Sequence, residues 1–360
     1  MLRRKGPSRL LLIFSTLLLG GCALNGPQSI FDTAGPVAAS QADLFVYIFW
    51  FAVFVFVAVT AALVYAVFKY RRRGDDDGSV PDQIHGVAWL EAAWTVAPAV
   101  ILVLIGFPTV RLILETESRV EPGQQDLVVN VTGYQWWWEF EYPELGVTTA
   151  NELHIPTGRR VVLNLNSGDV LHSFWVPRLA GKRDLIPNQD NQLWLSADEA
   201  GLYRGQCAEL CLGAHAYMRM RVIAESEAEF SAWANSFQQG GAQQVQAQVG
   251  TPQLEAGKAL FKTKGCANCH AIAGYAQGQA APDLTNFGVR TSLAAGVAEN
   301  TPENLTNWIR NPQELKPGNL MPTLWAADDP KRDEEVAALV AYLESLGTQA
   351  PPTASVQARR

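Results

Sequence analysis

The residues with the clearest chemistry lie in one short stretch, Cys207–Met218, which reads CAELCLGAHAYM. It offers two thiols, one imidazole and one thioether, from Cys207, Cys211, His215 and Met218, at offsets of 0, 4, 8 and 11 residues. These groups are soft ligands, and the mixture suits copper better than hard ions such as calcium or magnesium. The stretch is therefore predicted to be a metal-binding loop.

A complete site needs a ligand from another strand, and His172 is the candidate, 35 residues before Cys207. Three other kinds of site compete with one that uses all of these ligands. A disulfide between Cys207 and Cys211 suits an oxidising compartment, but it would leave His172, His215 and Met218 unexplained. A zinc site would not usually recruit methionine, and a mononuclear copper site would leave one thiol unused.

A second constellation, Cys266-Ala-Asn-Cys269-His270, has the Cys-x-x-Cys-His spacing that attaches c-type haem. The two thiols form thioethers with the haem, and His270 becomes an axial ligand of the iron. Met321, the only methionine after the motif, is the expected second axial ligand, and Met/His ligation raises the reduction potential. A redox dithiol followed by a chance histidine is the alternative.

Composition narrows the class of protein. The chain has 360 residues, enough for two or three domains, and a net charge of −7. An acidic chain argues against nucleic acid as a partner. All five cysteines fall at recognisable places, one near the N-terminus and two in each motif above. Cysteine usage therefore indicates metal and haem chemistry and not a disulfide framework.

The N-terminus reads as an export signal. Residues 1–21 have a basic start and an apolar run over residues 10–19, as signal peptides do. The run ends in Leu-Gly-Gly-Cys22, which resembles a bacterial lipobox, so Cys22 is the candidate lipidation site. An ordinary signal peptide or an uncleaved anchor is the alternative. In each case the following sequence starts outside the cytoplasm.

Residues 22–120 are predicted to form a transmembrane hairpin, with apolar spans over residues 44–68 and 87–114. The first span has about 25 residues, enough to cross a bilayer. Basic residues follow it at once and place that end in the cytoplasm. Glu91 lies near the cytoplasmic end of the second span. A carboxylate at that depth is costly, so it either has a function or reaches the interface with water.

After the hairpin, the pattern changes to short β-rich runs over residues 121–237, punctuated by Gly, Pro and Asp. This is typical of an all-β Greek-key sandwich or barrel. Residues 238–250, rich in Gln and Gly, are predicted to be a flexible linker. Residues 251–347 have helical patterns around the Cys266 motif, and residues 348–360 are expected to be disordered. The expected fold class is a multidomain membrane protein.

Residues 25–237 resemble subunit II of haem–copper cytochrome c oxidases. The resemblance rests on the Cys207 loop, on Val-Leu-His172-Ser and on residues 133–138 (GYQWWW). It implies a cupredoxin-like domain with a binuclear copper centre, called Cu-A, in which two thiolates bridge two copper ions and share one electron. The implied ligands are His172, Cys207, Cys211, His215, Met218 and the backbone carbonyl of Glu209. All of these positions are filled, unlike those of a quinol-type relative that has lost them.

The same resemblance assigns roles to three residues. Trp136 matches an exposed aromatic through which electrons reach the copper. The carboxylate of Glu209 matches one that reaches a Mg²⁺ shared with subunit I. Glu91 matches a glutamate near the mouth of a proton path in subunit I.

Residues 250–347 resemble a class I cytochrome c domain, and the two resemblances together match the fused subunit II of caa3-type oxidases. They imply a proton-pumping cytochrome c oxidase in a bacterial cell membrane, with both cofactor domains on the outer side. Electrons would arrive through haem c, a separate cytochrome c, or both, and pass through Cu-A to the haem and Cu-B of subunit I, where O₂ becomes water. Subunits I and III are the expected partners.

Two other function classes fit the same motifs. One is another binuclear-copper enzyme: the hairpin argues against a soluble nitrous oxide reductase, but a membrane nitric oxide reductase stays open. The other is a copper-binding or electron-carrying membrane protein with no oxidase partner. The subunit that purifies with the chain discriminates among them.

Overall fold

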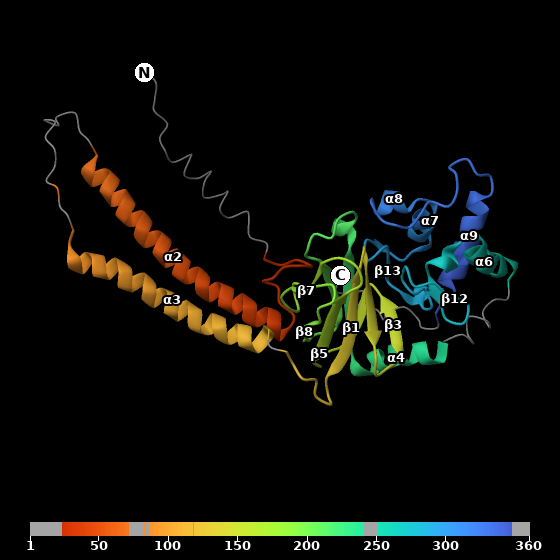
Figure 1. The fold of residues 1–360 in the computed structure, drawn as a ribbon, viewed down its shortest axis with the longest axis horizontal. Helices are drawn as coiled ribbons and strands as arrows, with labels where there is room; N and C mark the ends of the chain where they lie inside the picture. Colours follow the sequence, from red (N-terminus) through yellow and green to blue (C-terminus); the bar gives the residue numbers. More distant parts are fainter. Residues whose placement is uncertain (1–23, 72–82, 84–85, 118, 241–250, 348–360) are drawn as a thin grey trace, which may run out of the picture.

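The computed structural model describes residues 24–71, 83, 86–117, 119–240 and 251–347. Two long helices, a β-sandwich and a small helical domain follow one another along the chain (Figure 1). Cys22, the predicted signal peptide and the predicted tail lie outside the described residues, as do residues 241–250 of the predicted linker.

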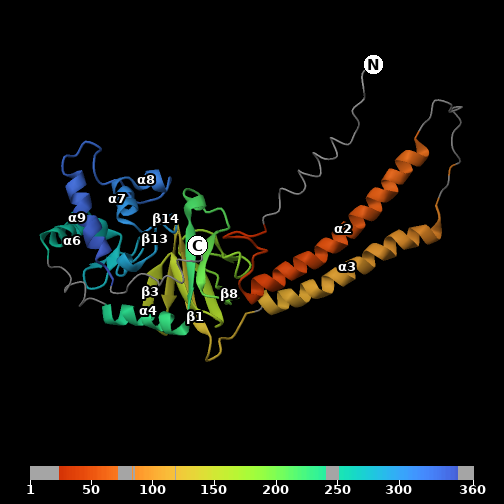
Figure 2. The ribbon, with the colours of Figure 1, turned by 180° about the vertical axis from the view of Figure 1, so that it is seen from behind.

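The two long helices are α2 (Pro36–Tyr70) and α3 (Ala88–Glu117). They lie side by side and extend away from the sandwich (Figures 1 and 2). Both are long and apolar enough to cross a bilayer, and the most apolar stretch of each is not buried by the rest of the chain. Side chains of this kind need lipid or another subunit around them. Helix α2 includes the first predicted span, residues 44–68, and α3 begins one residue after the start of the second, residues 87–114.

The first turn of α2 is bonded to the sandwich. The N–H of Ala34 donates to the carbonyl of Arg178 over 2.8 Å, and the carbonyl of Ala34 accepts from the N–H of Asp198 over 2.9 Å. Gly35 lies so close that an added Cβ would meet the carbonyl oxygen of Ser196 at 2.3 Å. The helix therefore starts from a rigid junction and not from a hinge.

The sandwich has two five-stranded sheets. The first has the order β3-β2-β1-β5-β8, with β3 (Val147–Ala150), β2 (Trp137–Tyr142), β1 (Leu127–Tyr134), β5 (Val161–Ser167) and β8 (Asn191–Leu195). The second has the order β4-β10-β9-β6-β7, with β4 (Glu152–Pro156), β10 (Arg219–Glu225), β9 (Gly201–Cys207), β6 (His172–Trp175) and β7 (Arg183–Leu185). Sequence neighbours such as β3 and β4 lie in different sheets, so the chain crosses between layers as a Greek-key arrangement requires.

The sequence of β1 shows why the layers pack. Its residues alternate between buried and half-buried along the whole strand, as the two-residue period of a strand requires. The buried set packs with Trp138, Phe140 and Phe174 in the core between the sheets. Helix α4 (Glu227–Gly240) then covers one end through Phe230 and Trp233, and it continues three residues into the predicted linker.

The second domain is built around two packed helices, α6 (Pro252–Thr263) and α9 (Arg332–Glu344). They approach closely at Gly257, where an added Cβ would lie 2.1 Å from the carbonyl oxygen of Ala338. Between them come η2 (Cys266–Asn268), β11 (Ala271–Ile272), β12 (Ala276–Gln277), η3 (Phe287–Val289), β13 (Ser292–Leu293), β14 (Ala298–Glu299), α7 (Pro302–Arg310) and α8 (Pro312–Leu315). The domain is helical as expected, with two short two-stranded ladders added.

Candidate functional site

The metal-binding loop is closed by its flanking strands. It leaves β9 at Cys207 and enters β10 at Arg219, and the N–H of Cys207 donates to the carbonyl of Met218 over 2.9 Å. Between these points the chain folds back through Gly213, which has φ +36°. An added Cβ at Gly213 would overlap the indole of Trp136, 2.1 Å away. The loop therefore needs glycine at this position, both for its backbone and for the close approach of Trp136.

The loop brings its ligand candidates together with His172, which starts β6. The sulfurs of Cys207 and Cys211 lie 3.9 Å apart, far beyond the S–S bond length of about 2.05 Å, so the thiols are free. The Nδ1 atom of His172 lies 3.9 Å from the Cys207 sulfur, and that of His215 lies 3.5 Å from the Cys211 sulfur. The thioether of Met218 lies 3.9 Å from the Cys211 sulfur.

The remaining candidate ligand also faces this cluster. The backbone carbonyl of Glu209 lies 3.2 Å from the Cys207 sulfur and accepts a hydrogen bond from it. The side chains of His172, Cys207, Cys211 and Met218 are buried, so water is largely excluded from the sulfurs. The donor set is soft and dry, which suits copper.

The two cysteines share a hydrogen bond that moves their pKa values in opposite directions. A hydrogen bond from the Cys211 thiol is the main cause that lowers the pKa of Cys207 to about 4, with His172 assisting. The same hydrogen bond raises the pKa of Cys211 well above its ordinary value. A metal must therefore displace one proton, that of Cys211, before both sulfurs can act as thiolate ligands.

A carboxylate behind the imidazole was not foreseen from the sequence. The Nε2 atom of His172 lies 2.8 Å from Oδ1 of Asp169, and Oδ2 of Asp169 accepts from the N–H of Gln135 over 2.7 Å. Burial alone would lower the pKa of His172, but hydrogen bonds with Cys207 and Asp169 outweigh it and raise the pKa. Because Nε2 is held by the carboxylate, Nδ1 is left to face the sulfurs, as in other carboxylate–histidine–metal arrangements.

Replacing Asp169 with Asn is expected to weaken copper binding by about 10- to 100-fold, because the neutral amide no longer holds the imidazole as strongly. Copper titration of metal-depleted protein measures the change. Asp190→Asn is the matched control, since Asp190 only accepts a hydrogen bond from Asn166 at the surface. Equal copper affinity in the two variants would show that Asp169 does not act on the site.

The Cys-x-x-Cys-His motif opens onto a cavity of about 320 Å³. Cys266, Cys269, His270 and Met321 all line it, although Met321 is far from the motif in sequence. The Nδ1 atom of His270 lies 2.7 Å from the carbonyl of Pro282 and donates to it, since a carbonyl can only accept. Burial lowers the pKa of His270, so the imidazole is neutral and its Nε2 lone pair is available to a metal.

The residues of this cavity fit a haem. Arg290 lines it, and its buried Nε atom has no hydrogen-bond partner within the described part of the chain. A buried guanidinium N–H without a partner is rare and indicates an absent acceptor. The carboxylates of a haem supply such an acceptor, and two thiols, an imidazole and a thioether supply its attachment and axial ligands.

Trp136 differs from the expectation of an exposed aromatic. Its side chain is only 8% exposed, because it packs in the core of the sandwich with Cys207, Cys211 and Ala214. The indole Nε1 donates to the carbonyl of Cys211 over 3.0 Å. The same residue lines the cavity at the Cys-x-x-Cys-His motif, together with Gln135, Trp137 and Asn151 of the sandwich. Trp136 therefore contacts the metal-binding loop and faces the cavity.

Glu91 is not brought near either cofactor site. It lies in the first turn of α3, at the end of the hairpin far from the sandwich (Figure 1). Its side chain is exposed in the isolated chain.

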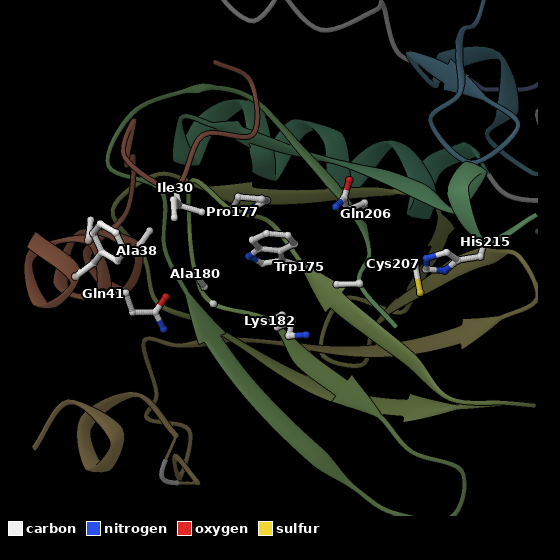
Figure 3. A pocket seen from close by; sticks show the side chains of 14 residues that line it. Ile30, Ala38, Gln41, Trp175, Pro177, Ala180, Lys182, Gln206, Cys207 and His215 are labelled. Carbon is white, nitrogen blue, oxygen red and sulfur yellow. The ribbon is translucent and has the colours of Figure 1, made fainter. Parts of the chain in front are cut away.

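A second cavity, of about 560 Å³, lies between the sandwich and the first turns of α2. Figure 3 shows Trp175 in its middle, Gln41 on the α2 side, and Cys207 and His215 at the opposite edge. Two of the candidate metal ligands thus border a recess on the side of the membrane helices.

Comparison with known families agrees with this division of the chain. Residues 23–112 match the transmembrane domain of cytochrome c oxidase subunit II, residues 145–225 match its periplasmic domain, and residues 254–347 match cytochrome c. The chain is 39% identical to cytochrome c oxidase subunit 2 of Alkalihalophilus pseudofirmus, over 95% of this chain and 98% of that one. It is 36% identical to the Bacillus subtilis protein of the same name, over 94% and 96%.

A more partial likeness links the chain to oxidases with another electron donor. It is 34% identical to quinol oxidase subunit 2 of Bacillus subtilis, over 64% of this chain and 71% of that one.

Proposed function

Because this chain belongs to the cytochrome c oxidase subunit II family and carries a cytochrome c domain, we propose that it delivers electrons to a proton-pumping, caa3-type oxidase. The chain is a membrane-bound part of an oxidase complex. In the proposal, electrons arrive through haem c, from a separate cytochrome c donor where one is present, and leave through Cu-A. They reach the haem and Cu-B of subunit I, where O₂ is reduced to water.

One observation carries the two-copper proposal. The two sulfurs lie 3.9 Å apart, and each has its own imidazole, His172 beside Cys207 and His215 beside Cys211. A single metal would need all four groups around one point, whereas two metals bridged by both sulfurs need one imidazole at each end. The Glu209 carbonyl lies beside the Cys207 sulfur, and the Met218 thioether lies beside the Cys211 sulfur. Each would supply one further, weak ligand. A quinol-type subunit would not need this donor set.

The residues around the sulfurs keep the site rigid and dry. When bound, the copper pair supplies one-electron transfer, and the haem supplies the same chemistry in the other domain. Asp169 and strand β6 hold His172 in place. The hydrogen bond from the N–H of Cys207 to the carbonyl of Met218 joins the two ends of the loop that carries both cysteines. A site whose ligands move little between two charge states is suited to fast electron transfer, because little reorganisation is needed.

In the second domain, Cys266 and Cys269 would hold the haem covalently, and His270 and Met321 would be its axial ligands. The Pro282 carbonyl orients His270, and Arg290 offers a buried N–H to a haem carboxylate. Trp136 would lie between the two cofactors, since it lines the haem cavity and donates to the Cys211 carbonyl.

The membrane arrangement follows from the hairpin. Both cofactor domains would lie on the outer side, with subunit I against the exposed faces of α2 and α3 and subunit III as a further partner. The recess beside Cys207 and His215 lies on the side of the membrane helices. On that side of the domain, the Glu209 carboxylate would reach a Mg²⁺ shared with subunit I. Glu91, at the cytoplasmic end of α3, would serve the mouth of a proton path. Cys22 would carry the lipid.

The deciding experiment is purification of the complex from membranes, with copper and haem analysis and measurement of O₂ uptake. We expect two coppers and one haem c on this chain, a large multi-helix partner with further haem and a single copper, and O₂ consumption. Reduction of nitric or nitrous oxide in place of O₂, or the absence of a partner, would contradict the proposal.

Replacing Met321 with Ala is expected to leave the haem covalently attached but to change its axial ligation, because the thioether is lost while both thiols remain. The optical spectrum of the oxidised haem and its reduction potential measure the change, and the potential should fall. The control is Thr323→Ala, which changes an exposed residue two positions away that does not line the cavity. A spectrum unchanged from the native protein would mean that another residue holds the sixth position.

A further inference from the structure

The two cofactor domains are joined by charged groups that are buried across their interface. The carboxylate of Glu152, on β4, is 1% exposed and accepts from the N–H and hydroxyl of Thr291 and from the hydroxyl of Ser292, at 3.0, 2.7 and 2.6 Å. Arg221, on β10, forms an ion pair with Glu299 of the helical domain at 2.8 Å. Buried charges that are paired across an interface fix its register, because any other register would leave them unpaired.

A third charged group lies at the centre of this interface. Lys316 follows α8 in the helical domain, and its residue is 4% exposed. Its Nζ atom donates to the backbone carbonyl of Trp136 over 2.6 Å and to that of Ala294 over 3.3 Å. The shorter bond therefore crosses between the domains. Burial of the ammonium group lowers the pKa of Lys316 to about 7, which is the cost of placing a lysine here.

The backbone around Lys316 also follows the metal-binding loop closely. Gly318, at φ +82°, lies so near the loop that an added Cβ would be 3.3 Å from the backbone of Gly213 and Ala214. Where the loop enters β10, the N–H of Arg219 donates to the carbonyl of Ala295 over 3.1 Å. The helical domain thus contacts the middle of the loop, the residue that follows the loop and the Trp136 peptide at once.

We propose that Lys316 is a positioning residue that holds the helical domain on the Trp136 peptide, so that the haem cavity is closed by the wall of the copper domain. The cavity has Trp136 and Trp137 as part of its lining only while the domains are docked in this register. The chain that joins the domains keeps them near each other, but it does not determine which of their surfaces meet. Lys316 determines this by donating a hydrogen bond to the carbonyl of Trp136, the aromatic residue that would lie between the cofactors.

The docking role of Lys316 does not depend on the proposed function. Its effect on electron transfer between haem and copper rests on that function. A simpler role, support of the helical fold alone, would need the main partners of Lys316 to lie in its own domain. Only Ala294, the more distant of its two acceptors, does so.

The test is Lys316→Met in the purified complex, which keeps the chain length and apolar stem but removes the donor. Amide hydrogen exchange at Arg219 reports docking directly, since its N–H is bonded across the interface to Ala295. Loss of a hydrogen bond from a charged group should lower protection there by about tenfold or more. Amides in the middle of β1 should keep their protection. Electron equilibration between haem and copper after photoreduction of the haem should slow in parallel.

Two further variants make the outcome specific. Lys331→Met, a change at an exposed lysine of the same domain, should alter neither measurement. Glu299→Gln weakens the ion pair with Arg221 at the edge of the interface and should lower protection less than Lys316→Met does, because Glu299 is partly exposed. If Lys316→Met does not take up haem, Lys316→Gln is measured in its place.

Unchanged exchange at Arg219 in the Lys316 variant would overturn the inference. Faster exchange at Arg219 with unchanged haem-to-copper equilibration would also overturn it, because docking would then not control the junction. A native complex without copper or haem would instead contradict the proposed function, and exchange at Arg219 would still decide the role of Lys316.

Discussion

Replacing Cys207 with Ser is expected to abolish the two-copper centre and leave haem c in place. A serine hydroxyl is a hard ligand that stays protonated at neutral pH, so it cannot bridge two copper ions as a thiolate does. The helical domain has its own core, separate from that of the sandwich, and should fold and bind haem normally. Copper analysis, the electron paramagnetic resonance spectrum of the oxidised protein and haem quantification measure the three parts of this result.

Ser173→Ala is the matched control for this change. Ser173 is fully buried next to His172, and its hydroxyl has no hydrogen-bond partner within the described residues. Its loss should therefore cost little stability and no copper. Retention of two coppers per chain in Cys207→Ser would refute the bridging role, and loss of haem c would refute the independence of the domains.

Replacing Trp136 with Ala is expected to slow electron equilibration between haem and copper by about 100-fold, the size of effect that a small misplacement at a reaction junction can have. The indole lies between the cavity at the Cys-x-x-Cys-His motif and the metal-binding loop, and it donates to the carbonyl of Cys211. Its removal leaves the saturated side chain of Gln135, which also lines the cavity and donates to the Cys211 carbonyl over 2.9 Å, as the remaining link. Photoreduction of the haem, followed by absorbance at the copper centre, measures the rate.

The neighbouring Trp137→Phe serves as the control, because Trp137 packs on Ala295 and stacks on Tyr134 without contacting the loop. Truncation of a buried tryptophan typically costs about 3–5 kcal/mol of stability, so copper and haem content are measured alongside the rate. Trp136→Phe should fall between the native protein and Trp136→Ala. A native rate in Trp136→Ala with both cofactors present would place the junction elsewhere.

The clustering of the candidate ligands could be predicted from the sequence because soft side chains are rare and their spacing is local. Cys207, Cys211, His215 and Met218 lie within one loop, so their types and offsets were enough to indicate copper. The strands could also be predicted, since β1 keeps a strict two-residue alternation. His172 lies farther away, but the register of β6 against β9, with Phe174 opposite Cys207, brings it to the loop.

The surroundings of these ligands could not be predicted in the same way. Trp136 was expected to be exposed, because it matches an exposed aromatic of the oxidase subunit. The sequence does not show that its indole packs into the core of the sandwich, or that Lys316, 180 residues later, donates to its backbone carbonyl. Lys316, Glu152 and Arg221 resemble ordinary surface charges in the sequence, and only docking reveals them as buried. In the sequence, Asp169 could be noticed only as a carboxylate three residues before a histidine.

The burial of Trp136 also concerns the electron donor. A separate cytochrome c cannot reach an indole that is only 8% exposed. With the helical domain docked beside Trp136, such a donor would have to deliver its electrons to haem c and not directly to copper.

The bonded start of α2 has a consequence for the oxidase in its membrane. Both the N–H and the carbonyl of Ala34 form hydrogen bonds with the sandwich, and Gly35 packs closely against the sandwich backbone. A tilt of α2 is therefore transmitted to the sandwich as a rotation of the whole domain. Helices adjust their tilt to the thickness of the surrounding bilayer. If the Cys207–Met218 loop passes electrons to a neighbouring subunit as proposed, lipid thickness would help to set how the two meet.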